Sequence, residues 1–229
     1  MRFLLVSDVH KSFRIYRNYN ESVAVEWLLN VIDRVKPEVL ISAGDWDDGM
    51  TPNDFLNIMS KVKKLLTVYG NHENFPLIEG YVMHDGKVYE VGGLKIAGIN
   101  GLIGEGSKKG IPMTSPTRFR NALYRIKKAV DRLDILVMHQ PPYLPEVYPE
   151  MSEDEGSALV YQGIEELKPR LFFNGHMTQG CYTFHNFQFQ TKYLRVDSSQ
   201  LHKCYGVLES NSRELTVYQE EKEVFKMEF

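Results

Sequence analysis

The sequence predicts an α/β fold whose first half carries parallel strands, and three observations support this prediction. Short apolar runs at residues 3–6, 39–43 and 65–69 have the length and composition of strands buried on both faces. The segments between these runs, residues 21–36 and 52–64, place apolar side chains at helical spacing. Each apolar run stops at polar residues. Alternating strands and helices of this kind are typical of a doubly wound parallel sheet.

The two predicted helices of this half have recognisable ends. Pro37 follows the first helix, and proline cannot continue a helix because it lacks the backbone N–H. Pro52 stands at the first turn of the second helix, where a missing N–H leaves no hydrogen bond unmade. Residues 11–20, which precede the first helix, form a polar segment dotted with aromatic residues and are predicted to be a loop.

The second half of the chain has a different texture. Residues 87–98 alternate in short segments around a Gly-Gly pair, which predicts a hairpin, and residues 101–116 form a glycine-rich loop. Helices are predicted at 117–132 and 156–168, and buried strands at 135–138 and 171–173. The remainder alternates polar and apolar residues, so an antiparallel C-terminal meander is expected. Its predicted strands are 182–184, 187–189, 193–196, 206–208 and 215–218.

Composition narrows the class of protein. A chain of 229 residues suits one domain, residues 1–229, and a net charge of −3 argues against a nucleic-acid partner. No apolar stretch approaches the roughly 20 residues that span a bilayer, so no membrane partner is expected. The N-terminal apolar run is too short for a signal peptide. Cys181 and Cys204 form no CxxC pattern and are expected to be free thiols in a reducing compartment. The expected location is cytoplasmic.

Five predicted strands end in residues that can bind metal ions. Parallel strands of an α/β sheet gather ligand sites at their carboxyl ends, and alternate residues of an extended segment point to the same side. Four of the seven histidines lie at these strand ends. Mixed carboxylate, amide and imidazole ligands suit Mn, Fe or Zn, and two ions that share a carboxylate can activate a water. The residues are Asp8 and His10, Asp45, Asn71 and His72, His139, and His176.

These residues carry a resemblance to a known family. The ordered set resembles the calcineurin-like metallophosphoesterases over residues 1 to about 180. The resemblance implies a two-sheet αββα sandwich, and a phosphoesterase that cleaves a small phosphodiester or phosphomonoester by attack of a metal-bound hydroxide. The motifs are Asp8-x-His10, Gly44-Asp45-x-x-Asp48, Gly70-Asn71-His72-Glu73, His139 and Gly175-His176.

The resemblance also implies which of these residues bind metal ions. Asp8 and His10 would bind the first of two divalent ions, and Asp45 would bridge the two ions. The second ion would be held by Asn71, His139 and His176. Manganese is the expected metal, with Fe, Zn or Ni as alternatives.

Further residues are expected to act on the substrate. His72 takes the family's position for the histidine that contacts the phosphate and protonates the leaving group, and Asn71 lies beside it. Asp48 is expected to orient His72, with Asp47 as the adjacent alternative. Lys11 and Arg14 follow the first motif and are candidates for binding a substrate phosphate.

One position departs from the family pattern. The usual Gly-His-x-His motif reads Gly175-His176-Met177-Thr178, so Thr178 replaces an imidazole of the first metal. The first site is therefore expected to be weak, or to be completed by water, Thr178 itself or Gln179. A binding or scaffold protein with a degraded metal site is the alternative function. The presence of the expected proton donor His72 and of the metal ligands favours the enzyme. The net negative charge disfavours a nuclease.

Overall fold

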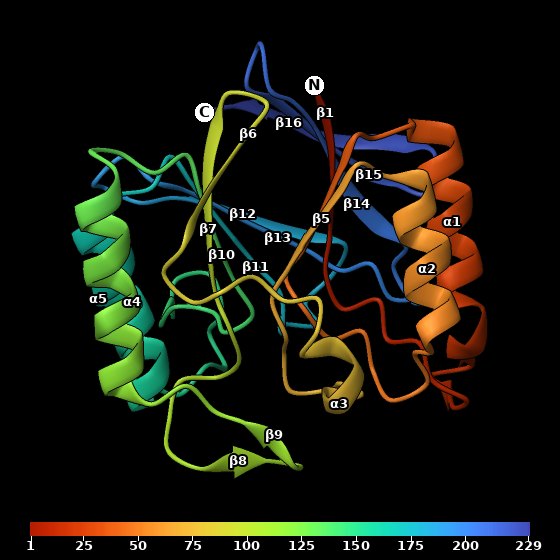
Figure 1. Cartoon of the computed structure of the whole chain (residues 1–229), viewed down its shortest axis with the longest axis horizontal. Helices are drawn as coiled ribbons and strands as arrows, with labels where there is room; N and C mark the ends of the chain where they lie inside the picture. Colours follow the sequence, from red (N-terminus) through yellow and green to blue (C-terminus); the bar gives the residue numbers. More distant parts are fainter.

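The computed structural model describes residues 1–229 and shows two six-stranded mixed sheets packed face to face with helices outside them (Figure 1). In spatial order the first sheet contains β16 (Lys222–Glu228), β15 (Glu214–Gln219), β14 (Cys204–Glu209), β1 (Arg2–Val6), β4 (Val39–Ser42) and β5 (Lys64–Thr67). The second sheet contains β12 (Tyr182–Asn186), β13 (Lys192–Val196), β11 (Leu171–Asn174), β10 (Ile135–Met138), β7 (Leu94–Ile99) and β6 (Val88–Val91). This arrangement confirms the αββα sandwich.

Helices cover the outer face of each sheet. Helices α1 (Ala24–Val35) and α2 (Pro52–Lys61) lie on the first sheet, and α4 (Pro116–Ala129) and α5 (Glu155–Leu167) lie on the second (Figure 1). None of these helices has the length and apolarity to cross a membrane. The smaller elements are η1 (Glu21–Val23), α3 (Phe75–Ile78), the hairpin β2 (Ile15–Tyr16) and β3 (Tyr19–Asn20), and the hairpin β8 (Ser107–Lys108) and β9 (Ile111–Pro112).

Both faces of the central strands of each sheet are buried, which explains the continuous apolar runs of the sequence. In β1, Phe3 and Leu5 face the core between the sheets, whereas Leu4 and Val6 pack against the helix side. Alternate residues of a strand point to opposite faces, so a strand between two apolar layers needs apolar side chains at every position. The second sheet repeats this division, with Val137 in the central core and Leu136 in the core beneath α4 and α5.

The first half of the chain folds as predicted. Strands β1, β4 and β5 are parallel, and each predicted helix is present with ends shifted by a few residues. The predicted hairpin is formed by β6 and β7, with Gly92 and Gly93 at φ values of 59° and 77°. Left-handed backbone at both turn positions favours glycine, because it has no Cβ. The segment predicted as a loop, residues 11–20, instead contains the small β2–β3 hairpin.

The C-terminal strands form antiparallel pairs, as predicted, but they are divided between the two sheets and do not form one meander. Strands β12 and β13 join the second sheet, where β13 runs parallel to β11, and β14, β15 and β16 extend the first sheet from β1. The predicted strand at 187–189 is wrong, because these residues form the turn between β12 and β13. Phe187 donates its N–H to the carbonyl of Thr191 at 2.9 Å and stacks on Phe189. Local alternation does not reveal which sheet a strand joins.

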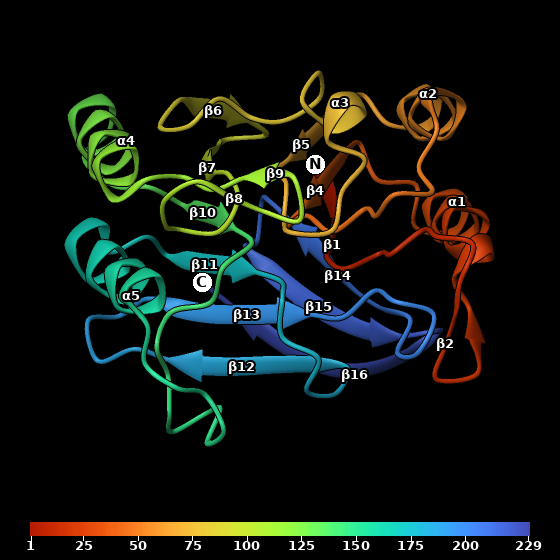
Figure 2. The same ribbon diagram turned by 90° about the horizontal axis from the view of Figure 1, so that it is seen from below.

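The parallel strands bring their carboxyl ends together at one end of the sandwich, which Figure 2 views from below. The N–H of Asp8 donates to the carbonyl of Gly44 at 2.9 Å, and the N–H of His10 donates to that of Asp45 at 3.0 Å. Backbone hydrogen bonds therefore tie the first two motifs to each other before any side chain is considered.

The two cysteines are not thiols, so this prediction was wrong. Cys181, just before β12, and Cys204, the first residue of β14, form a disulfide with a Cα–Cα distance of 5.5 Å. The bond joins the two sheets. The predicted reducing compartment therefore loses the argument based on free cysteines, because disulfides persist in oxidising environments.

We expect the disulfide to stabilise the folded chain measurably. The cysteines are separated by 23 residues, and closing a loop of this size is worth about 3 kcal/mol of unfolding free energy. Denaturant unfolding of wild type and of the Cys181→Ala/Cys204→Ala variant measures the difference. Reductant should destabilise the wild type and leave the double variant unchanged. Two titratable thiols in the untreated native protein would contradict the pairing.

Candidate active site

Unusual backbone turns aim the predicted metal ligands into one space. Asp8, His10, Asp45 and His176 all have left-handed backbone, with φ values of 56°, 50°, 59° and 73°. Residues other than glycine adopt this conformation rarely, and such residues cluster at functional sites. Each strand therefore ends in a sharp turn that directs its polar side chain across the end of the sandwich.

The predicted ligands of the second metal converge on His139. Its Nε2 lies 3.2 Å from Asn71 Oδ1, 3.1 Å from His176 Nδ1 and 3.3 Å from Asp45 Oδ1. Its Nδ1 donates to the carbonyl of Ala43 at 2.8 Å, which leaves Nε2 facing the cluster. A second imidazole nitrogen, an amide oxygen and a carboxylate oxygen thus lie around the buried Nε2 of His139.

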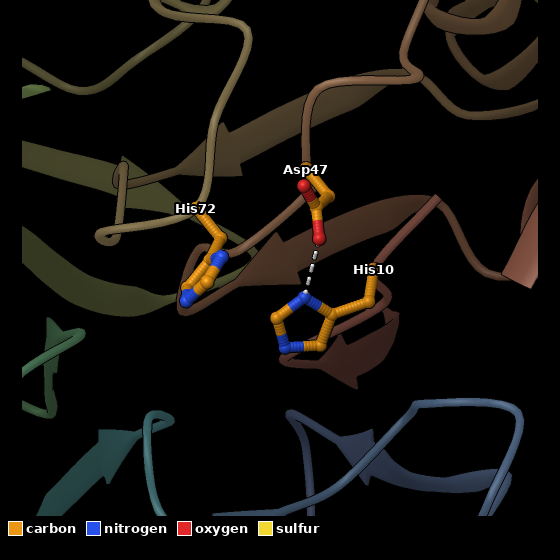
Figure 3. A group of neighbouring side chains, drawn as sticks. All are labelled: His10, Asp47 and His72. Carbon is orange, nitrogen blue, oxygen red and sulfur yellow. Dashed lines mark hydrogen bonds and ion pairs between the residues drawn. The ribbon is translucent and has the colours of Figure 1, made fainter. Parts of the chain in front are cut away.

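The predicted ligands of the first metal surround the other oxygen of Asp45. His10 Nε2 lies 3.7 Å from Asp45 Oδ2 and 3.8 Å from Asp8 Oδ1. Asp45 therefore presents one oxygen to each set of ligands, which is the geometry of a bridging carboxylate. The orientation of His10 is set by Asp47, whose Oδ2 accepts a hydrogen bond from His10 Nδ1 at 3.0 Å (Figure 3).

The donor set fits divalent metal ions. Candidate ligand atoms of Asp8, Asp45 and His139 lie within 4.8 Å of one another, and so do those of His10, Asp47 and His72. Carboxylate, amide and imidazole donors in this proportion suit borderline ions such as Mn, Fe or Zn. Because Asp47 already holds His10 Nδ1, we assign it to the orientation of His10 rather than to direct ligation.

At two positions of the motifs, a neighbouring side chain lies so close to the backbone that only glycine fits. A Cβ on Gly70 would lie 2.1 Å from Asp45 Oδ1, and one on Gly175 would lie 2.0 Å from Ser7 Oγ. Both distances are far below any van der Waals contact. Any side chain at these positions would displace Asp45 or the Ser7 hydroxyl, which donates to Asp8 at 2.5 Å.

The carboxylates of the cluster attract positive charge to their neighbours. Burial raises the pKa of Asp8 to about 6, and the neighbouring carboxylate of Asp45 adds to the rise. Burial alone would lower the pKa values of His10 and His139, but the surrounding carboxylates raise them to about 10 and about 9. Burial together with His139 lowers the pKa of His176 to about 3, which leaves it a neutral imidazole. Packed buried carboxylates of this kind are stabilised by positive charge.

Glu73 is a functional residue of the motif that received no role from the sequence. Its Oε1 accepts the N–H groups of Asp45 and Gly70, both at 2.8 Å, and its Oε2 accepts that of Trp46 at 3.1 Å. Burial raises the pKa of Glu73 to about 8. The side chain therefore clamps together the two turns that follow β4 and β5. Its position next to His72 in the motif was the available signal.

His72 lies at the exposed side of the cluster, but not beside Asp48. Asp47 lies close to it instead, whereas Asp48 is exposed and makes no side-chain contact with His72. The left-handed φ of 74° at Asp47 turns that side chain inward, and the N–H of Asp47 donates to the carbonyl of His72 at 2.8 Å. The orienting role predicted for Asp48 is therefore not supported by the structure. Burial lowers the pKa of His72.

Two basic residues of the first loop have different environments. Lys11 pairs with Asp54 in the first turn of α2 at 2.9 Å and does not line the site, so its predicted phosphate contact is not supported. Arg14 lines the site and pairs with Asp47 at 2.6 Å, with 56% of its side chain exposed. A third basic residue, Lys109 after β8, lies 3.1 Å from His72 Nε2. The sequence showed Lys109 only as part of a glycine-rich loop.

Thr178, which replaces the histidine of the family pattern, lies at the site itself. Thr178 lines the cavity next to His176, whereas Gln179 does not. His185 is 3.7 Å from Glu146, so it does not replace the missing imidazole. The buried carboxylate of Asp197 also lines the cavity and was overlooked, although it directly follows β13. Its place at a strand end was the signal that could have identified it.

Arg195, in β13, holds the loop that carries His176 and Thr178. Its guanidinium is buried and donates to the carbonyls of Met177 at 2.7 Å, Gln179 at 2.5 Å and Gly180 at 3.0 Å. Two more bonds, of 3.2 and 3.0 Å, reach the hydroxyl of Thr183. A fully buried arginine with all its bonds on one segment acts as a positioning residue for that loop.

Comparison with known proteins places the chain in a family. A sequence model of the calcineurin-like phosphoesterase family matches residues 1–179, and the chain belongs to that family. No curated protein sequence matches the chain significantly.

Solved structures share the fold at low sequence identity. A dimetal phosphatase from Danio rerio matches with a TM-score of 0.65 and 10% identity, covering 97% of each chain. A purple acid phosphatase from yellow lupin matches with a TM-score of 0.67 and 12% identity, covering 98% of this chain and 52% of that one. GAP50 of Plasmodium, described as the anchor in the inner membrane complex, matches with a TM-score of 0.58 and 14% identity, covering 100% and 88%.

We expect Arg195→Met to weaken metal binding as well as the fold. Loss of the loop's hydrogen bonds frees His176, and removal of such outer contacts lowers metal affinity by about 10–100-fold. Calorimetric titration with Mn²⁺ measures the effect, and Arg195→Lys should restore part of it. Arg170→Met is the control, because Arg170 pairs with Asp134 at 3.2 Å just before β11, at the end opposite the site. Equal Mn²⁺ affinity in wild type and a folded Arg195→Met would refute the positioning role.

Proposed function

We propose that the chain is a metal-dependent phosphoesterase that hydrolyses a small phosphodiester or phosphomonoester. One observation supports this above the others. A single cavity of about 280 Å³ is lined both by candidate metal ligands and by groups suited to a phosphate. The ligands are Asp8, His10, Asp45, Asn71 and His176, and the other groups are His72 and Arg14.

Different residues of the chain would hold the metal ions and bind the phosphate in such a reaction. Two divalent ions, with manganese expected, would supply an activated water and positive charge for the phosphoryl oxygens. Asp8, His10 and Asp45 would hold the first ion, and Asp45, Asn71, His139 and His176 the second. Arg14, half-exposed at the cavity, is placed to bind a phosphate oxygen once it leaves Asp47.

His72 is the candidate proton donor. It lines the cavity without taking part in the His139 cluster, and its ring lies 5.5 Å from that of His10. Burial and the nearby positive charges of His10 and Lys109 lower its pKa, so a proton carried by this imidazole is readily given to a departing oxygen. Asn71, whose Oδ1 faces His139, keeps its proposed contact with the substrate as a second role.

A binding or scaffold protein with an impaired metal site is the alternative. Thr178 in place of an imidazole favours it, and the fold is shared with GAP50, described as an anchor. The enzyme is favoured because His72 faces the cavity and the second set of ligands is complete. The net charge of −3 still argues against a nucleic-acid substrate, and the cytoplasmic location stays a prediction.

Hydrolysis of a phosphoester panel with and without Mn²⁺ tests the proposal. Activity should depend on the ion, and Asp45→Asn should lower metal affinity at least about tenfold because its carboxylate faces both sets of ligands. Asp48→Asn is the matched comparison and should retain activity, since Asp48 is exposed. Bis-p-nitrophenyl phosphate, p-nitrophenyl phosphate, nucleotides and cyclic nucleotides form the panel. Full turnover by a protein shown to be metal-free would refute the mechanism.

The role of His72 is tested by the leaving group. His72→Asn should slow hydrolysis of esters with poor leaving groups by about 10²–10⁴-fold, as expected for loss of a general acid. Nitrophenyl esters should lose much less, because nitrophenolate leaves without protonation. Metal content should stay at the wild-type level. The same loss for both kinds of ester would assign His72 to another role.

A further inference from the structure

The exposed apolar residues of the chain are concentrated beside the active-site cavity. Eight large hydrophobic side chains are exposed, and five of them lie within residues 13–23. Ile15 is 76% exposed and Tyr16 43%, both in the β2–β3 hairpin. A group of exposed apolar side chains of this kind usually marks a binding surface. The five are Phe13, Ile15, Tyr16, Tyr19 and Val23.

The hairpin is held in place relative to the candidate metal ligands. Ser12 donates a hydrogen bond to the buried carboxylate of Glu21, and the N–H of Arg14 donates to Ser12 Oγ at 3.1 Å. The guanidinium of Arg14 pairs with Asp47, which also accepts from His10. The exposed apolar side chains therefore stand on a base that is tied to the site.

The hairpin and the site share one cavity. Only three of its 15 lining residues are hydrophobic, namely Ile15, Tyr16 and Leu201. The remaining residues are polar or charged and include His72 and Arg14. A ligand that fills this cavity therefore meets an anion-binding region beside a small apolar region. The guanidinium of Arg17 lies 5.2 Å from the centre of the Tyr16 ring.

We infer that Ile15 and Tyr16 form a subsite for an aromatic ring in the organic group of the phosphoester. The inference rests on the proposed phosphoesterase function, since it places the phosphate at His72 and Arg14. A planar ring matches the tyrosine ring and the side of Ile15, and stacking adds to the effect of apolar burial. Residues 13–20 contain two arginines and no acidic residue in a chain of net charge −3, which suits an anionic ester.

Diesters with a common leaving group test the subsite. Methyl p-nitrophenyl phosphate and phenyl p-nitrophenyl phosphate release the same nitrophenolate and differ only in the group that remains. Wild type with Mn²⁺ should favour the phenyl ester in kcat/KM by about tenfold or more. Ile15→Ser and Tyr16→Ser should remove most of this preference by raising KM for the phenyl ester. Tyr124→Ser is the control, because Tyr124 is 62% exposed on α4 and does not line the cavity.

A binding measurement separates this inference from the proposed function. Phenylphosphonate and methylphosphonate are titrated calorimetrically into the Mn²⁺-loaded protein, which needs no turnover. Tighter binding of phenylphosphonate that is lost in Ile15→Ser and Tyr16→Ser supports the subsite even if no ester is hydrolysed. Hydrolysis of both diesters with equal kcat/KM, together with equal binding of both phosphonates, overturns the subsite and leaves the phosphoesterase intact. The apolar hairpin would then be assigned to contact with a protein.

Discussion

The site depends on the position of one buried carboxylate, that of Asp45. Its two oxygens face the two sets of candidate ligands, at 3.3 Å from His139 and 3.7 Å from His10. Oδ1 also accepts the N–H groups of Asn71 and His72, both at 2.8 Å. Burial alone would raise the pKa of Asp45, but the imidazoles of His139 and His10 hold it well below its usual range. The carboxylate is therefore ionised and fixed at the junction of two strand-end loops.

The fold supports this carboxylate through the loops that surround it. Glu73 clamps the backbone N–H of Asp45, and Gly70 leaves room for the carboxylate because it has no side chain. On the opposite side of the cluster, Arg195 holds the segment after β11 by its carbonyl groups. None of these three residues needs to contact a metal ion. They matter because buried charges keep a defined geometry only where their neighbours are themselves fixed.

The site also shows how one fold can serve different ligands. The candidate metal ligands come from strand ends, whereas two of the three apolar residues of the cavity, Ile15 and Tyr16, come from the β2–β3 hairpin between β1 and α1. Residues 15–20 belong to none of the sheet strands that carry the ligands, and Arg14 and Ser12 connect the hairpin to the site. Reaction type and substrate preference would then reside in separate segments of the chain.

The sequence by itself determined the parallel strands and the residue types at their ends, because buried strands and sharp turns leave local patterns. The tertiary structure decided what depends on backbone turns and distant packing. A left-handed φ at Asp47 brings that residue rather than Asp48 beside His72, and Asp54 draws Lys11 away. The pairing of Cys181 with Cys204 also depends on how the two sheets stack, since no local pattern encodes contacts between residues far apart in the chain.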